Sequence, residues 1–180
     1  MRRVVIIGCS GSGKSTLARR LGERTGLPVV HLDREYWRPG WVEPPRDDWR
    51  ARVAGLAAGE SWIIDGQYGG TLELRLARAD TLIFLDLAMP VCLLRVLRRT
   101  LSGYGRTRAE MSPGCPERFD WPFLKYVWNY RRSHRPKMHD IVAGFAGTRL
   151  TFTTPAGVAA WLDGLPAGGD ADQRRGISTQ

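Results

Sequence analysis

The residues best suited to chemistry lie near the N-terminus, in a segment that matches the pattern G-x-x-x-x-G-K-[ST] between Gly8 and Ser15. Glycines in this pattern let backbone N–H groups approach phosphate oxygens closely, because no Cβ stands in the way. Lys14 is expected to reach the β- and γ-phosphates of a nucleoside triphosphate, and the Ser15 hydroxyl to bind Mg²⁺. We therefore predict a binding site for ATP and Mg²⁺, made by Gly8, Cys9, Ser10, Gly11, Ser12, Gly13, Lys14, Ser15 and Thr16.

Two aspartates compete for the role of a carboxylate that assists Mg²⁺ binding. Asp65 ends the apolar run 62–64, and Asp86 ends the apolar run 81–85. Buried parallel strands end at the edge of the sheet where ligands bind, so both positions are suitable. We favour Asp65 as the catalytic carboxylate that holds the metal with Ser15, and interpret Asp86 as a helix cap or a strand-end turn residue.

A third aspartate, Asp33, follows the apolar run 29–32 and is expected at the same edge of the sheet. Its carboxylate would be suited to holding or deprotonating a hydroxyl group of a phosphoryl acceptor. Aspartate is also common in loops, where its side chain bonds nearby backbone groups, and the sequence leaves both roles open. His31, two positions earlier, is predicted to be structural.

Basic residues are concentrated between Arg95 and Lys137, where eleven lysines and arginines face three acidic residues. This balance of +8 accounts for most of the net charge of +9. Phosphoryl transfer spreads negative charge over the transferring group, and arginines placed around it lower the barrier. We predict that Arg98 and Arg99, which share a helix face with Arg95, are catalytic, and that a closing loop brings Arg106 and Arg108 to the acceptor. A solvated basic surface is the simpler alternative.

Aromatic and basic residues also alternate in the segment 121–135, which contains Trp121, Lys125, Trp128 and Arg132. Such a pattern can bind nucleic acid through base stacking and phosphate contacts. A helix that is buried on one side and basic on the other produces the same pattern, and we favour this second interpretation.

The elements expected around these residues indicate an α/β fold. Continuous apolar runs at 4–7, 62–64 and 81–85 read as buried parallel strands, 29–32 and 150–153 read as two further short strands, and helical segments separate them. We predict one domain over residues 1–165 and a disordered tail over 166–180. The three cysteines form no C-x-x-C pair, and no apolar run is long enough to span a bilayer, so we expect no membrane partner and a cytoplasmic location.

With these residues in place, the chain resembles the adenylate-kinase-like P-loop kinases, and most of all the group called DNA topology modulation proteins. Beyond the phosphate loop, the resemblance covers about residues 2–153 and rests on several short segments. They include His31-Leu32-Asp33, Tyr36-Trp37, Pro39-Gly40-Trp41, Trp62-Ile63-Ile64-Asp65-Gly66-Gln67-Tyr68, Arg98-Arg99, Gly114-Cys115-Pro116-Glu117-Arg118-Phe119-Asp120 and Trp128-Asn129-Tyr130.

The resemblance implies a P-loop NTPase fold: a three-layer α/β/α sandwich with a five-stranded parallel sheet, an acceptor-binding region near residues 33–60 and a lid near 99–118. It also implies phosphoryl transfer from ATP to a small acceptor, which could be a nucleotide. Here Gln67-Tyr68-Gly69 replaces the segment that usually carries a nucleotide-binding arginine, so Arg75 or Arg78 is expected to make that contact. The lid lacks four cysteines, so no zinc is expected. A nucleotide-gated protein that binds DNA on a kinase fold is the alternative.

Overall fold

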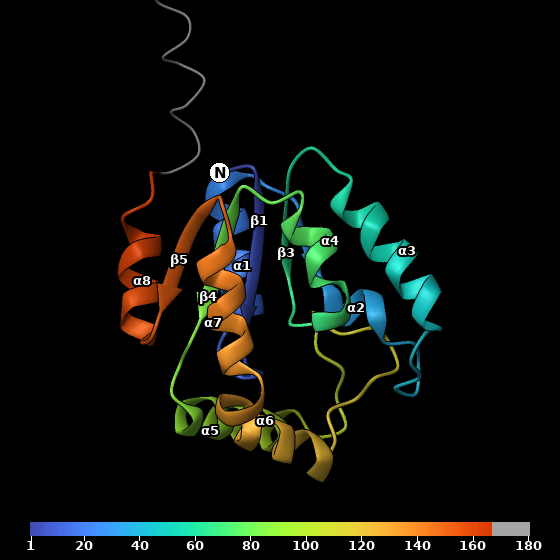
Figure 1. The fold of residues 1–180 in the computed structure, drawn as a ribbon. Coiled ribbons are helices and arrows are strands. Elements are labelled where there is room, and N and C mark those ends of the chain that lie inside the picture. Colours follow the sequence, from blue (N-terminus) through green and yellow to red (C-terminus); the bar gives the residue numbers. More distant parts are fainter. Residues whose placement is uncertain (167–180) are drawn as a thin grey trace, which may run out of the picture.

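The computed structural model describes residues 1–166, so the prediction of a disordered tail falls almost entirely outside the described residues. Five parallel strands form one sheet in the order β2-β3-β1-β4-β5 (Figure 1). The strands are β1 (Arg3–Gly8), β2 (Val29–His31), β3 (Trp62–Asp65), β4 (Thr81–Leu85) and β5 (Thr148–Phe152). The second strand ends one residue earlier than expected, because Leu32 already begins a helix.

Helices cover both faces of this sheet. They are α1 (Lys14–Thr25), α2 (Leu32–Tyr36), α3 (Arg46–Ala57), α4 (Leu72–Leu76), α5 (Met89–Gly103), α6 (Trp121–Ser133), α7 (Arg135–Gly144) and α8 (Pro155–Asp163), with a short 3₁₀ turn η1 (Gly69–Thr71). Helices α1 and α8 pack on one face, and α3, α4, α6 and α7 contribute to the core on the other. The predicted three-layer α/β/α sandwich with a five-stranded parallel sheet is therefore confirmed.

Side-chain alternation along the central strand builds the two cores. Val4 and Ile6 of β1 belong to the same core as Leu17 and Leu21 of α1, whereas Val5 and Ile7 belong to the core on the opposite face. Successive residues of a strand point to opposite faces, so a strand covered on both sides must be apolar throughout. This is why continuous apolar runs predicted the buried strands β1, β3 and β4 correctly.

Helices α5 and α6 lie next to each other across the end of the sheet toward which the strands run (Figure 1). Helix α5 leaves Leu94 and Leu101 on its outer side, where they are 68% and 70% exposed. The buried side of α5 is formed by Cys92, Val96 and Thr100. Packing over the phosphate loop sets this orientation, because the backbone of Cys92 lies directly against Gly11.

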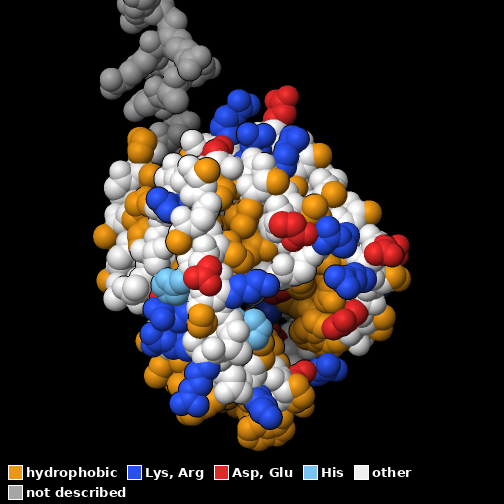
Figure 2. Space-filling model, viewed as in Figure 1, with side chains coloured by type: hydrophobic (Ala, Val, Ile, Leu, Met, Phe, Trp, Pro, Cys, Tyr) orange, Lys and Arg blue, Asp and Glu red, His pale blue; other side chains and the backbone are white. Residues whose placement is uncertain are grey.

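Helix α6 is buried on one side through Leu124, Val127 and Tyr130, and Asp120 caps it by accepting a 2.9 Å hydrogen bond from the backbone N–H of Phe123. Its other side exposes Trp121 and Trp128, and hydrophobic side chains gather at the surface over α5 and α6 (Figure 2). None of the helices within residues 1–166 is both long and apolar enough to cross a membrane.

Candidate active site

The phosphate loop connects β1 to α1 and leaves the first turn of that helix free to bind an anion. Gly11 and Gly13 have φ angles of +80° and +97°, and a Cβ on Gly11 would lie 2.3 Å from the carbonyl oxygen of Cys92. No side chain caps the N-terminus of α1, so its N–H groups and the helix dipole are available to phosphate oxygens. The hydroxyl of Ser12 is buried without a hydrogen-bond partner among the described residues, which also suits a loop that awaits a ligand.

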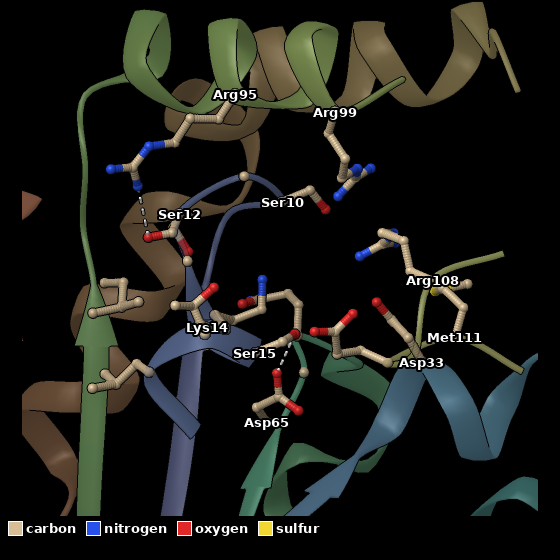
Figure 3. Close-up of a pocket in the computed structure, with 18 of the residues that line it drawn as sticks. Ser10, Ser12, Lys14, Ser15, Asp33, Asp65, Arg95, Arg99, Arg108 and Met111 are labelled. Carbon is tan, nitrogen blue, oxygen red and sulfur yellow. Dashed lines mark hydrogen bonds between the residues drawn. The ribbon is translucent and has the colours of Figure 1, made fainter. Parts of the chain in front are cut away.

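Lys14 lies at the start of α1, and its Nζ donates a 3.0 Å hydrogen bond to the backbone oxygen of Cys9. The lysine therefore folds back over its own loop, with its charge among the backbone groups that would surround a phosphate. Its neighbour Ser15 donates a 2.7 Å hydrogen bond to Oδ2 of Asp65, at the end of β3 (Figure 3).

Asp65 is buried and uses both carboxylate oxygens. Oδ2 accepts from Ser15, and Oδ1 lies 2.7 Å from Nδ1 of His31, at the end of β2. His31 thus holds the candidate metal carboxylate in place. Burial opposes a charge on His31, but the hydrogen bond and the charge of Asp65 outweigh it, and the pKa of His31 is raised. A hydroxyl and a carboxylate are oxygen donors of the kind Mg²⁺ binds, so Ser15 and Asp65 fit this metal.

Asp86, the competing carboxylate, is engaged elsewhere. Its two oxygens accept 2.7 Å hydrogen bonds from Nε and Nη2 of Arg135, and Nε2 of His139 lies 3.1 Å away. Helix α5 has Ala88 at its N-cap and no side-chain cap, so the interpretation of Asp86 as a helix cap is wrong. The carboxylate ties the end of β4 to α7. Burial opposes ionisation of Asp86, but the hydrogen bonds and charge of Arg135 prevail and its pKa is lowered.

We expect Asp86→Asn to lower the free energy of unfolding at neutral pH by about 1–3 kcal/mol, because charge-assisted hydrogen bonds to a half-exposed Arg135 and His139 are weakened. The folded-state pKa of Asp86 is lowered, so its contribution is present above the unfolded pKa of about 3.9 and disappears as the pH falls through the folded value. Thermal melting over a pH series should show the wild-type advantage shrink in acid. Asp140→Asn, on an exposed neighbour in α7, is the control, and a Tm loss as large there would contradict this assignment.

Asp33 lies on α2 and lines the same cleft as Ser15 and Asp65. Its Oδ1 accepts a 2.8 Å hydrogen bond from the hydroxyl of Tyr68, which fixes the carboxylate and leaves Oδ2 without a partner among the described residues. Figure 3 shows Asp33 on the side of the cleft where β3 ends, with Arg108 and Met111 next to it and the phosphate loop opposite.

Two arginines of α5 enter the cleft from above the phosphate loop (Figure 3). Arg95 donates from Nη1 to the backbone oxygen of Ser12 at 3.5 Å, and Arg99 pairs with the buried Glu117 at 3.2 Å. Burial, followed by the charge of Arg108, lowers the pKa of Arg99. Arg108 of the connecting segment pairs with the same Glu117. Glu117 therefore holds two of the expected arginines together.

Four predicted site residues lie elsewhere. Arg98 and Arg106 are exposed and do not line the cleft. One step along a helix turns the side chain by about 100°, so Arg98 points away from the cleft that the next residue, Arg99, faces. Arg75 is 0% exposed and donates to the backbone oxygens of Gly66, Gln67 and Tyr68, and burial lowers its pKa to about 10. Arg78 donates to the backbone oxygen of Ala58 at 3.2 Å. Neither Arg75 nor Arg78 lines the cleft, so the structure does not show the predicted contact of one of them with an acceptor. Arg75 instead supports the turn after β3.

Several residues of the site were not anticipated as such. Gln67 accepts a 3.0 Å hydrogen bond from the N–H of Gly8, Tyr68 orients Asp33, and Glu117 binds two arginines. Trp37 and Trp41 also line the cleft. One signal was present in the sequence: Glu117 is one of only three acids in the strongly basic segment, which favours an ion-paired role.

The cleft that these residues line has a volume of about 1080 Å³. Ligand pockets in proteins commonly enclose about 300–1,000 Å³, so there is room for a nucleotide and a second small molecule together. Figure 2 shows a hollow in this face of the molecule, with Lys and Arg side chains near its edge. The same cleft is lined by the phosphate loop, by the candidate metal donors Ser15 and Asp65, by the Asp33 carboxylate and by arginines of α5.

Comparisons with known proteins agree with this architecture. Shikimate kinase from Acinetobacter baumannii, solved in complex with shikimate, superposes with a TM-score of 0.56 at 16% identity, over 91% of this chain and 89% of that one. Shikimate kinase from Aquifex aeolicus superposes with a TM-score of 0.51 at 19% identity, over 89% and 93%. At such identities the likeness concerns the fold. No curated protein matches the chain. A model of a family described as AAA domain matches residues 4–112, more than half of the sequence, and the chain therefore belongs to this AAA-domain family of P-loop proteins.

Proposed function

We propose that this protein is a Mg²⁺-dependent kinase that transfers the γ-phosphoryl group of ATP to a small acceptor. The observation that carries the proposal is the hydrogen-bonded pair of Ser15, in α1, and Asp65, at the end of β3. The carboxylate of Asp33, with Oδ2 unbonded among the described residues, lines the same cleft. A protein that only bound or hydrolysed nucleotide would not need a second carboxylate fixed by its own tyrosine. The fold likeness to shikimate kinases supports the same class of reaction.

In this proposal the backbone of Gly8–Thr16 and the Lys14 ammonium hold the ATP phosphates. Ser15 and Asp65 would hold Mg²⁺, which neutralises charge on the β- and γ-phosphate oxygens. Arg95 and Arg99 place positive charge beside the transferring group, and Arg108 joins them through Glu117. Asp33 holds the acceptor hydroxyl and accepts its proton. The helices that cross the end of the sheet exclude water from this space.

The orientation of α5 changes the role predicted for Arg98. Arg95 takes the role that Arg98 was expected to have, because Arg95 and Arg99 are four residues apart and share the face turned toward the loop. The alternative of a nucleotide-gated DNA-binding protein gains no support from the family match or from the fold likeness.

The test is an acceptor screen. Purified protein, Mg²⁺ and ATP are combined with nucleoside monophosphates, nucleosides, monosaccharides and other small alcohols, and ADP is measured. We expect ADP formation to require one class of acceptor and to stop when EDTA removes Mg²⁺. Equal ADP formation with and without every acceptor would contradict the kinase proposal.

A further inference from the structure

The acceptor side of the cleft has an aromatic wall built around Asp33. Trp37 lies four residues after Asp33, so both side chains are on one face of α2 and its C-terminal end, and both line the cleft. Trp41 completes the wall, with its ring 5.3 Å from that of Trp37 and nearly perpendicular to it. Behind them, Tyr36 packs against Trp37 and against Tyr68, the tyrosine that holds Asp33.

This wall is fixed in place by the segment after α5. Nε1 of Trp41 donates a 3.1 Å hydrogen bond to the backbone oxygen of Pro116, and the N–H of Gly40 donates to the oxygen of Gly114 at 2.9 Å. Trp41 has a φ of +65°, in the left-handed region that favours glycine. A bulky residue adopts this conformation only when its surroundings hold it there, and such strain is typical of functional sites. The tryptophan is therefore held as part of a binding surface.

Each of the arginines beside this wall has a carboxylate partner. Arg99 and Arg108 share Glu117, and Arg118, whose guanidinium lies over the Trp41 ring at 5.4 Å, has Asp120 within 3.8 Å. The carboxylates of Asp33 and Glu110 line the same cleft, and neither is in an ion pair among the described residues. A phosphate group placed against Asp33 would meet like charge in a half-buried site, whereas a hydroxyl group would meet a hydrogen-bond acceptor. The carboxylate of Asp33 thus favours a hydroxyl nucleophile over a phosphate nucleophile.

Large indole faces bind the flat, apolar side of a ring and leave its hydroxyl groups free to be positioned by polar residues. From the wall, the paired arginines and the Asp33 carboxylate, we infer that the acceptor is an uncharged alcohol carried on a ring, of the nucleoside or monosaccharide class, and not a nucleoside monophosphate. This inference rests on the proposed kinase function and specifies its acceptor.

The reaction on such an acceptor is balanced without any further reactant. The acceptor O–H bond breaks and its proton passes to Oδ2 of Asp33. The oxygen forms a bond to the γ-phosphorus while the bond between that phosphorus and the β,γ-bridging oxygen breaks. ADP leaves, and Asp33 returns its proton to solvent. No oxidation or reduction takes place.

Matched pairs of acceptors test the inference. Each nucleoside is assayed beside its 5′-monophosphate, and each monosaccharide beside its phosphate ester, with the phosphorylated product identified by mass spectrometry. The nucleoside and monosaccharide arms decide between the two ring types. We expect at least one uncharged member to exceed its phosphorylated partner in kcat/KM by about tenfold or more, since an uncompensated buried charge is strongly disfavoured.

Four variants keep the test specific. Trp37→Ala should raise the KM for the acceptor about tenfold with the KM for ATP unchanged, Trp37→Phe should restore most of it, and Trp128→Ala, an exposed tryptophan on α6, should change neither. Asp33→Asn should lower kcat by about 10²–10⁴-fold while ATP binding persists. If a nucleoside monophosphate proves the better acceptor, the inference is overturned and the kinase function stands. If no acceptor of either kind promotes ADP formation, both the inference and the proposed kinase function are contradicted.

Discussion

Lys14→Ala is expected to lower kcat by about 10²–10³-fold, because it removes a positive charge placed where charge develops during phosphoryl transfer. The side chain bonds only to the backbone oxygen of Cys9 among the described residues, so its loss should leave the fold intact. Affinity for ATP should fall as well, since in the proposed complex the same ammonium would contact the phosphates in the ground state. Steady-state ADP formation, ATP titration and thermal melting measure the three effects.

The matched control for this substitution is Lys125→Ala. Lys125 is exposed on α6 and does not line the cleft, so it removes the same charge at a site where no phosphate is expected. Turnover and ATP affinity should stay near wild type. Unaltered turnover and affinity in Lys14→Ala itself would exclude the phosphate loop as the working site.

Asp65→Asn is expected to abolish the dependence of the reaction on Mg²⁺ and to lower kcat by about 10²-fold or more. The amide keeps the size of the carboxylate and can still accept from Ser15, but it lacks the charge that a divalent cation requires. ATP affinity measured with Mg²⁺ and with EDTA provides the readout. The wild type should bind more tightly with Mg²⁺, and the variant should show little difference.

Asp86→Asn is the control, because Asp86 follows β4, on the other side of β1 from β3, and was the competing candidate for the metal. Its carboxylate is already used by Arg135 and His139, so the variant should lose stability and keep its requirement for Mg²⁺. If Asp86→Asn and not Asp65→Asn loses that requirement, the assignment of the metal carboxylate is reversed.

The loss of folding stability caused by Asp65→Asn should also depend on pH. The folded-state pKa of His31 is raised, with burial opposing and Asp65 favouring the charged ring. The contribution of a protonated His31 is therefore present below the unfolded pKa of about 6.5 and is lost as the pH rises through the folded value. Compared with the wild type, the variant should be destabilised more at about pH 5.5 than at about pH 8.

Local sequence was sufficient to predict a feature wherever one short segment determines both its structure and its chemistry. The phosphate loop was predictable because strand, glycines, lysine and helix are contiguous between Val4 and Leu21, and Asp65 because a strand end defines its place. The apolar strands were predictable because burial on both faces leaves no polar positions. These features depend on neighbours in the chain.

The parts that sequence could not predict depend on packing between distant segments. Which of Arg95, Arg98 and Arg99 faces the phosphates follows from the rotation of α5, and that rotation is set by the contact of Cys92 with Gly11. Arg75 was expected at the acceptor, but three carbonyls in the turn after β3 needed donors and bind its guanidinium. The aromatic wall was equally hidden, because Trp41 is oriented by Pro116, 75 residues away in sequence.

The central claim is that the γ-phosphoryl group moves to an acceptor and not to water. ATP labelled at the γ-phosphorus, supplied with the acceptor panel and Mg²⁺, tests this directly when product and inorganic phosphate are separated and counted. We predict that the label appears in a phosphorylated acceptor in the same amount as the ADP formed, and that Lys14→Ala abolishes this transfer. Recovery of all the label as inorganic phosphate, whichever acceptor is present, would contradict the account.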